Sequence, residues 1–225
     1  MKRIEDGIWT LEHPFSMPGG IQIGTRSTWV RLTDGTLLLH APGPLTQAHR
    51  EAAAEIGPVS VIVAPNAFHH LYVAEAVESF PGATLYAAPS LGDKLSGLSS
   101  RPLRPEPEPA WGDVLQQEPV GGMPRMDEWV FFHGVSRTLL LVDLCFNMQR
   151  FGNRRTGWFM RLAGAYARFG PSRLARSMMK DRAALRASLE RILAWDFDRV
   201  VVTHGDIVDT GGKSALREAF ASIES

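Results

Sequence analysis

Three apolar runs of the strand type each end in a side chain that can bind a metal ion. This repeated pattern constrains the fold more than any other feature of the chain. Open α/β folds place their functional sites at the carboxyl ends of strands, so the pattern predicts a site there. The runs are residues 59–63, 138–142 and 199–203, and the side chains that follow them are His69 and His70, Asp143, and His204.

The remaining periodicity predicts two β-rich stretches, each followed by helical material. This order favours an α+β fold, a four-layer αββα sandwich. Residues 88–109 are expected to be a loop with one short helix at 90–95, and residues 144–195 to be helical. Strands are predicted at 7–11, 21–24, 27–32, 36–39, 59–63, 84–87, 129–133, 138–143 and 196–203, and helices at 46–56, 71–80 and 214–223.

Length and composition indicate one globular domain over residues 1–225, with a helical insertion at about 146–193. The 24 basic and 24 acidic residues balance, so the net charge gives no argument for nucleic-acid binding. Cys145 is the only cysteine, which excludes an internal disulfide and favours a reducing compartment. Residues 1–8 lack the apolar core of a signal peptide, and no apolar run approaches the roughly 18–20 residues of a membrane span. We therefore expect a cytoplasmic protein.

Several segments resemble the metallo-β-lactamase-like superfamily. The hairpin around Asp34-Gly35 and the last strand, which ends in Thr203-His204-Gly205-Asp206, both match it. More closely, the chain resembles a domain-of-unknown-function branch of that superfamily. The marks of this branch are His40-Ala41-Pro42, Ala64-Pro65-Asn66-Ala67-Phe68-His69-His70, and the run from Phe131 to Leu144.

The superfamily usually carries His-x-His-x-Asp-His, then a Gly-His, a bridging Asp and a final His. The resemblance places Pro65 and Ala67 at the first two histidine positions, and Gly122-Met123 near the Gly-His. It places His69 at the aspartate position. The ligands exclusive to the first metal site are therefore missing, while the second site keeps His69, His70, Asp143 and His204.

This surviving half-site predicts a mononuclear metal centre. Imidazole and carboxylate ligands suit Zn²⁺ best, with Fe²⁺ or Mn²⁺ as alternatives. The expected function is a metal-dependent hydrolase of a small-molecule ester, amide, thioester or phosphoester, with a metal-bound hydroxide as nucleophile. Asp143 would ligate the metal or orient the water. His40, Glu128 and His133 are further candidates, as ligand, orienting partner or proton carrier.

Two other interpretations stay open at this point. The same cleft could belong to a non-catalytic, metal-free protein that binds a ligand or partner, or the histidines could be purely structural. A redox-type relative ranks last, because the usual ligands of a dinuclear iron centre are absent.

Residues 148–180 combine basic and aromatic side chains and contain no Asp or Glu. We favour a lid or a homodimer helix pair whose apolar face packs on the core. Contact with an acidic membrane surface is the alternative. The basic residues are Arg150, Arg154, Arg155, Arg161, Arg168, Arg173, Arg176 and Lys180.

Overall fold

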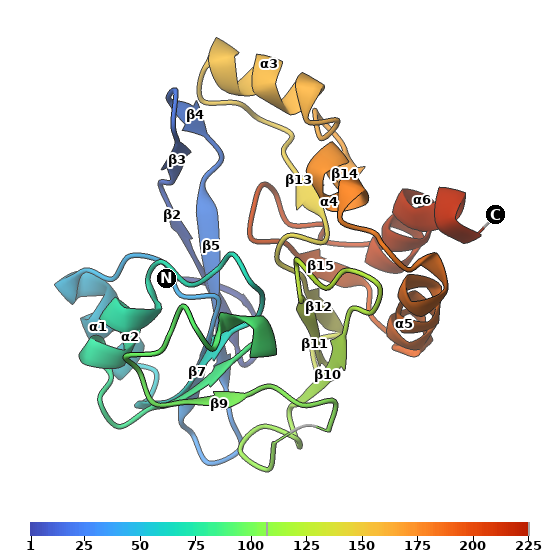
Figure 1. Cartoon of the computed structure of the whole chain (residues 1–225). Helices are drawn as coiled ribbons and strands as arrows, with labels where there is room; N and C mark the ends of the chain where they lie inside the picture. Colours follow the sequence, from blue (N-terminus) through green and yellow to red (C-terminus); the bar gives the residue numbers. More distant parts are fainter. Residues whose placement is uncertain (107, 225) are drawn as a thin grey trace.

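The structure is a computed structural model of the chain, and it describes residues 1–106 and 108–224. Two β-sheets face each other in the middle of the molecule, with helices on the outside of each sheet (Figure 1). This arrangement is the αββα sandwich that the sequence predicts.

The first sheet contains seven strands in the order β1-β2-β5-β6-β7-β8-β9. Strands β1, β2, β5 and β6 pair antiparallel, whereas β6, β7, β8 and β9 run parallel. The bounds are β1 Lys2–Glu5, β2 Ile8–His13, β5 Thr25–Arg31, β6 Leu37–His40, β7 Val59–Ala64, β8 Thr84–Ala87 and β9 Ser100–Pro102.

The second sheet has the order β10-β11-β12-β15. Strands β10, β11 and β12 pair antiparallel, and β15 joins β12 in parallel although it lies about 60 residues further along the chain. The bounds are β10 Leu115–Pro119, β11 Trp129–His133, β12 Thr138–Leu140 and β15 Arg199–Val201.

Strands β11, β12 and β15 of the second sheet are largely apolar, because they are buried on both faces, whereas the edge strand β10 carries Gln116 and Glu118. Phe131, Leu140 and Val201 lie in register and belong to the core between the two sheets. Their neighbours belong to a second core against the outer helices. These neighbours are Phe132, Leu139 and Val200, again in register. Because successive side chains of a strand point to opposite faces of the sheet, each strand contributes residues to both cores.

The helices cover the two outer faces (Figure 1). Helices α1 (Gln47–Ala54) and α2 (Val73–Ser79) lie beside the first sheet, and α5 (Arg182–Ala194) and α6 (Gly212–Glu224) lie beside the second. The side chain of Thr46 accepts a hydrogen bond from the His49 backbone N–H, which caps α1 as its sequence predicts. Asp181 caps α5 in the same way, through Ala184.

A smaller layer stands above the sandwich (Figure 1). One part is a hairpin of β3 (Ser16–Met17) and β4 (Ile21–Gln22). The other parts are α3 (Arg154–Leu162), α4 (Arg173–Ser177), and a ladder of β13 (Phe146–Asn147) with β14 (Phe169–Gly170). The Thr156 hydroxyl accepts a 2.8 Å hydrogen bond from the Gln22 backbone N–H, which joins α3 to the hairpin.

Several expected elements differ from the structure. The helical stretch 144–195 is interrupted, because Gly164 and Gly170 adopt positive φ and Pro171 follows directly. The strand expected to reach Asp143 ends at Leu140, because the backbone N–H groups from Val142 onward turn toward a buried carboxylate described below. Strands β9 and β10 lie where no strand was predicted, and the expected helix 90–95 is one 3₁₀ turn, η1 (Pro89–Leu91). Among the described residues, every helix falls short of the length and apolar character that a membrane span requires.

The protonation of His13 makes the stability of this fold depend on pH. It is buried on β2, and its Nε2 lies 3.0 Å from the Ser27 hydroxyl, which also accepts a hydrogen bond from the Trp29 indole. Burial and the nearby His49 lower the pKa of His13 to about 4. In the unfolded chain the His13 imidazole is protonated near pH 6.5, whereas in the folded protein it is protonated only near pH 4.

We expect the free energy of unfolding to decrease as the pH falls from 6.5 to 4, with a contribution from His13 on the order of 2 kcal/mol. His13→Gln should be less stable than the parent at pH 8 but should lose less stability on acidification. Urea unfolding at a series of pH values measures both curves. Equal slopes for the two proteins would contradict this role of His13.

Candidate metal centre

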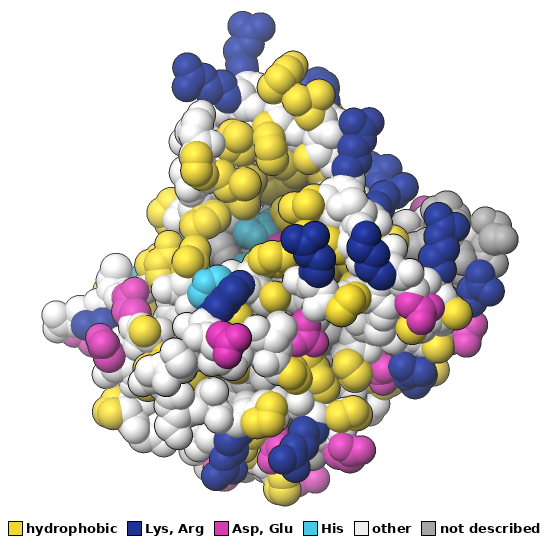
Figure 2. Space-filling view, in the orientation of Figure 1, with side chains coloured by type: hydrophobic (Ala, Val, Ile, Leu, Met, Phe, Trp, Pro, Cys, Tyr) yellow, Lys and Arg dark blue, Asp and Glu magenta, His cyan; other side chains and the backbone are white. Residues whose placement is uncertain are grey.

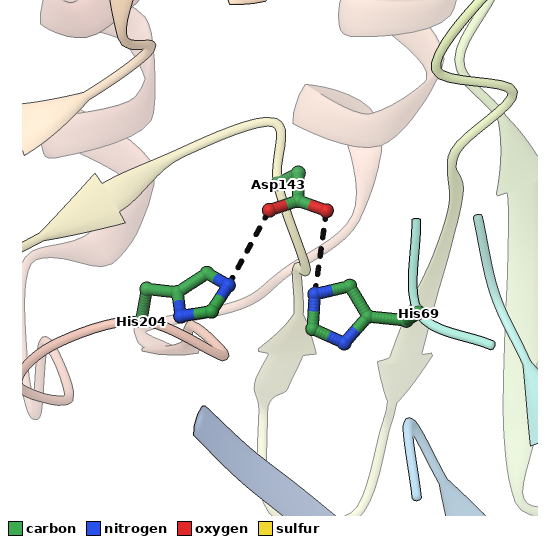
Figure 3. Close-up of side chains that lie close together, drawn as sticks. All are labelled: His69, Asp143 and His204. Atoms are coloured by element: carbon green, nitrogen blue, oxygen red, sulfur yellow. Dashed lines mark ion pairs between the residues drawn. The ribbon is translucent and has the colours of Figure 1, made fainter. Parts of the chain in front are cut away.

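Three of the expected ligands meet where the two sheets face each other: His69, Asp143 and His204 (Figure 3). His69 follows β7 of the first sheet, whereas Asp143 and His204 follow the parallel strands β12 and β15 of the second. The His69 Nε2 lies 3.3 Å from Asp143 Oδ2, and the His204 Nε2 lies 3.5 Å from Asp143 Oδ1. Their potential ligand atoms all lie within 4.8 Å of one another.

The ring of His204 is held in place from two sides. Its Nδ1 lies 2.7 Å from the Gly24 carbonyl oxygen, to which it donates, and its ring stacks on Phe146 at 5.0 Å between centroids. The turn that delivers it depends on Gly205, whose φ is +104°. A Cβ at this position would lie 2.2 Å from the Asn147 carbonyl oxygen, so only glycine fits.

Asn66 connects the two sheets at the site. Its side-chain oxygen accepts hydrogen bonds from the backbone N–H groups of Phe68 (3.0 Å) and His69 (2.9 Å), which shapes the turn that presents His69. Its side-chain nitrogen donates to Asp143 Oδ2 at 2.7 Å and to Glu128 Oε2 at 3.2 Å. One buried amide therefore orients both the His69 turn and the Asp143 carboxylate.

Glu128 lies fully buried behind Asp143 and binds the segment that follows β12. Its two oxygens accept the backbone N–H groups of three consecutive residues, Val142 (2.8 Å), Asp143 (2.7 Å) and Leu144 (2.9 Å). Burial and the neighbouring Asp143 carboxylate raise the pKa of Glu128, and the hydrogen bonds from the backbone and Asn66 oppose this rise and favour the carboxylate. Glu128 acts through the backbone and does not face the cluster centre.

Asp143 stays ionised in these surroundings. Burial alone would raise its pKa, but the charges and hydrogen bonds of His69 and His204 overcome this effect and hold the pKa below its usual range. An ionised carboxylate between two imidazoles is the charge state that a divalent cation requires of its ligands.

The donor set fits a single transition-metal ion. Ligand atoms around a tetrahedral zinc ion, with bonds of about 2.1 Å, lie about 3.4 Å apart. Each imidazole Nε2 lies at such a distance from one Asp143 oxygen, Oδ2 for His69 and Oδ1 for His204. In neutral His204 the Nδ1 carries the proton donated to Gly24, so Nε2 directs a lone pair at the Asp143 carboxylate. Two hydrogen-bond acceptors, His204 Nε2 and an Asp143 oxygen, would then face each other. A cation bound by both, or a proton on Nε2, removes their repulsion.

The structure does not bring the other candidates into this cluster. His70 follows His69 directly but is not part of the cluster, and its pKa is lowered by burial and by Lys94. His40 ends β6 beside β7, and its ring packs edge-on against Phe131 at 5.2 Å. Burial and the charge of His69 lower the pKa of His40 to about 3, so this ring is neutral.

His133 lies at the opposite end of the second sheet. It pairs with Thr138 at the start of β12, whereas Asp143 follows the end of that strand. Its Nδ1 lies 2.7 Å from the Ser136 hydroxyl in the turn between β11 and β12. Because β11 runs antiparallel to β12, the residue at the carboxyl end of β11 cannot reach the carboxyl end of β12.

A largely apolar cavity of about 340 Å³ opens onto the three side chains. Figure 2 shows histidine side chains in and beside the hollow of this face, below a group of hydrophobic side chains. The β3–β4 hairpin forms one wall, and the turn after β7 forms another. The lining residues are Phe15, Ser16, Met17, Pro18, Thr25, Pro42, Phe68, His69, Leu71, Tyr72, Asp143 and His204.

The family model of a domain of unknown function, DUF4336, matches residues 5–152. The chain belongs to this family. A search of curated proteins finds no match. The resemblance expected from the motifs around His40, His69 and Asp143 is thereby confirmed.

Solved structures confirm the fold of this DUF4336 chain. A metallo-β-lactamase from Pontibacter korlensis matches with a TM-score of 0.66 at 16% identity, over 100% of this chain and 98% of that one. The metallo-β-lactamase FIM-1 from Pseudomonas aeruginosa, in its mono-zinc form, matches with a TM-score of 0.63 at 14% identity, over 99% and 91%. The flavodiiron core Flv1 from Synechocystis sp. PCC6803, metal-soaked, matches with a TM-score of 0.65 at 12% identity, over 98% and 60%. At these identities the likeness establishes the fold.

Glu128 is among the orienting partners that the sequence suggests, but Asn66, Phe146 and Gly24, which also position the ligands, are not. Asn66 was noted only as part of a motif, although Asn directly after a strand is a common residue for turns closed by its own side chain. Phe146 and the carbonyl of Gly24 carry no local signal, because they reach His204 only through the tertiary fold.

Replacement of Glu128 tests the positioning of Asp143. In Glu128→Gln one acceptor oxygen becomes an N–H donor that faces the backbone donors of residues 142–144. We expect a loss of about 1–3 kcal/mol in the free energy of unfolding and a weaker metal affinity. Denaturant unfolding and metal titration measure these effects.

The matched control is Glu51→Gln, on the exposed face of α1, which should change stability by less than about 0.5 kcal/mol. A Glu128→Gln protein as stable as this control would show that Glu128 does not hold the segment.

Proposed function

We propose that this protein is a mononuclear metal-dependent hydrolase of a small-molecule substrate. The observation that carries the proposal is the convergence of His69, Asp143 and His204, at the spacing of metal ligands, on the wall of the 340 Å³ cavity. A divalent metal ion, with zinc the best fit to this donor set, would polarise a substrate carbonyl or phosphoryl group and lower the pKa of a bound water to about 7.

Three protein ligands fit a catalytic site better than a structural one. Structural zinc sites are closed by four protein ligands, whereas catalytic sites keep a position for water or substrate. Among residues 1–106 and 108–224, no further His, Cys, Asp or Glu joins the cluster. The open side of the cluster faces the cavity.

The protein's own groups would orient and enclose the reacting atoms. The Gly24 carbonyl holds the tautomer of His204, and Asn66 holds the Asp143 carboxylate, as outer partners of metal ligands commonly do. The apolar walls of the cavity exclude water and suit a substrate with an apolar part next to the scissile ester, amide, thioester or phosphoester bond.

A single metal site distinguishes the proposal from a two-metal mechanism. Pro65, Ala67 and Met123 occupy positions where the superfamily carries histidines, and none of these side chains is a carboxylate or an imidazole. A dinuclear redox centre lacks half of its ligands for the same reason. The proposed enzyme acts in the cytoplasm, and its only cysteine, Cys145, is a buried free thiol.

Metal analysis of protein purified without added metal tests the proposal. We expect about one equivalent of zinc, iron or manganese per chain, and less than 0.1 equivalent in His204→Ala and Asp143→Ala, since two remaining ligands hold these ions weakly. His70→Gln is the matched control because it changes the neighbour of His69. It should keep its metal.

Two outcomes would contradict this site. Loss of metal in His70→Gln would show that His70 is a ligand. A parent protein that takes up none of the three metals would favour the metal-free ligand-binding alternative.

The hydrolase activity itself can be measured with p-nitrophenyl esters of short and medium acyl chains. We expect hydrolysis that a chelator abolishes and Zn²⁺ restores, and a decrease of at least 100-fold in Asp143→Asn. His133→Gln, remote from the cluster, should keep the activity within about threefold. Activity that survives chelation would contradict a metal-dependent reaction.

A further inference from the structure

Large exposed hydrophobic side chains gather on one part of the molecule. The described residues include seven such side chains, and all but Val135 belong to the β3–β4 hairpin, the turn after β7, or helices α3 and α4. Figure 2 shows hydrophobic side chains grouped above the histidines, with Lys and Arg side chains around their edge. The six are Met17, Phe68, Leu71, Trp158, Leu162 and Leu174, which we call the docking face.

Two cavities that share the β3–β4 hairpin connect these side chains. Met17, Phe68 and Leu71 line the mouth of the site cavity. The other side of the hairpin, at Ile21, lines a second cavity of about 750 Å³ together with Trp158. Leu162 lies one turn beyond Trp158 on α3.

Helix α4 continues the docking face. The Arg173 backbone N–H donates a 2.7 Å hydrogen bond to the Ala163 carbonyl, so α4, which carries Leu174, begins beside the end of α3. The expectation that the apolar face of this segment packs on the core holds for Met160 and Met178. It fails for Trp158 (65% exposed), Leu162 (51%) and Leu174 (64%).

The charge of the chain is strongly segregated toward this face. Residues 148–180 carry eight of the 24 basic residues and none of the 24 acidic ones, so the remainder of the chain has a net charge of −8. In the part of the chain that the structure describes, Arg150 pairs with Asp206. No described carboxylate pairs with Arg154, Arg155, Arg161, Arg173 or Arg176.

We propose that the docking face binds the surface of an anionic lipid bilayer. Interfacial segments place Trp and Leu among the headgroups and acyl chains while Lys and Arg contact the acidic headgroups. The docking face offers the apolar side chains, and Arg154, Arg155 and Arg161, which line the second cavity together with Trp158, offer the positive charge. Helix α3 has nine residues, too few to act as an independent anchor. The fold supports it instead, through the Gln22–Thr156 hydrogen bond and a 3.0 Å bond from Asn153 to the Gly20 carbonyl.

Bilayer binding has a consequence for the site. Phe68 and Leu71 belong to the docking face and also line the cavity that contains His69 and His204. The bound protein would therefore hold the mouth of that cavity against the lipid surface. Because the anionic cytoplasmic leaflet attracts basic surfaces, this orientation agrees with the cytoplasmic location proposed above.

Co-sedimentation of the full chain with vesicles tests the proposal without reference to metal or activity. In 0.1 M salt we expect binding to vesicles of 70% phosphatidylcholine and 30% phosphatidylglycerol, and at least tenfold weaker binding to pure phosphatidylcholine. Binding should disappear at 1 M salt, where exposed charges are screened within about 3 Å.

Two sets of variants locate the contact. Arg154→Gln/Arg155→Gln should bind the anionic vesicles about 25-fold less tightly, at about fivefold for each charge. Trp158→Ser/Leu162→Ser should reduce binding by about tenfold or more. Both side chains are exposed, so this variant should fold like the parent, which circular dichroism verifies. The matched charge control, Arg104→Gln/Arg217→Gln, removes two exposed cations elsewhere and should bind within about twofold of the parent.

Three outcomes would overturn the proposal. The first is failure of the parent to bind anionic vesicles at 0.1 M salt. The second is equal weakening by the control pair, which would indicate an effect of net charge alone. The third is a dimer in solution, detected by light scattering, that Trp158→Ser/Leu162→Ser dissociates, since the docking face would then be occupied by a second copy of the chain.

Discussion

The arrangement of the site depends on one buried carboxylate. Glu128 accepts three successive backbone N–H groups from residues 142–144, and this interaction ends β12 and turns the chain so that Asp143 points out of the sheet. Without an acceptor these N–H groups would be buried unsatisfied, at about 1–3 kcal/mol each. Asn66 extends the same network to the other sheet, so the two halves of the sandwich are joined where the site lies. The function proposed for the protein requires this polar contact inside an otherwise apolar core.

The fold then explains how ligands that are far apart in sequence converge. His69 follows a parallel strand of the first sheet, and Asp143 and His204 follow adjacent parallel strands of the second. The two sheets face each other, so these carboxyl ends meet at one edge (Figure 1). Three donors and one apolar cavity lie at this edge.

The layer above the sandwich differs from the rest of the molecule in its charge and in its exposed apolar side chains. A chain with no net charge contains a segment with eight positive charges and no negative ones, and this segment carries three exposed apolar side chains beside the cavity. Core packing does not require such a surface, since exposed apolar side chains of this size are costly unless something covers them. The site and the docking face share the β3–β4 hairpin, so substrate entry and surface contact involve the same element.

The sequence by itself determined the layers of the fold and the chemistry available to it. Period-two alternation and β-branched residues predicted strands at 59–63, 84–87 and 129–133, and Thr46 predicted the start of α1, because these signals act between neighbouring residues. It also provided the histidines and the aspartate. Only the tertiary structure decided which of them meet. His69 rather than His70 faces Asp143 because Asn66 sets the turn, and His133 lies remote because β11 runs antiparallel to β12. Local patterns carry no information on the direction of a side chain in a turn, on the partner of a buried carboxylate, or on which apolar residues stay exposed, since each depends on contacts between distant segments.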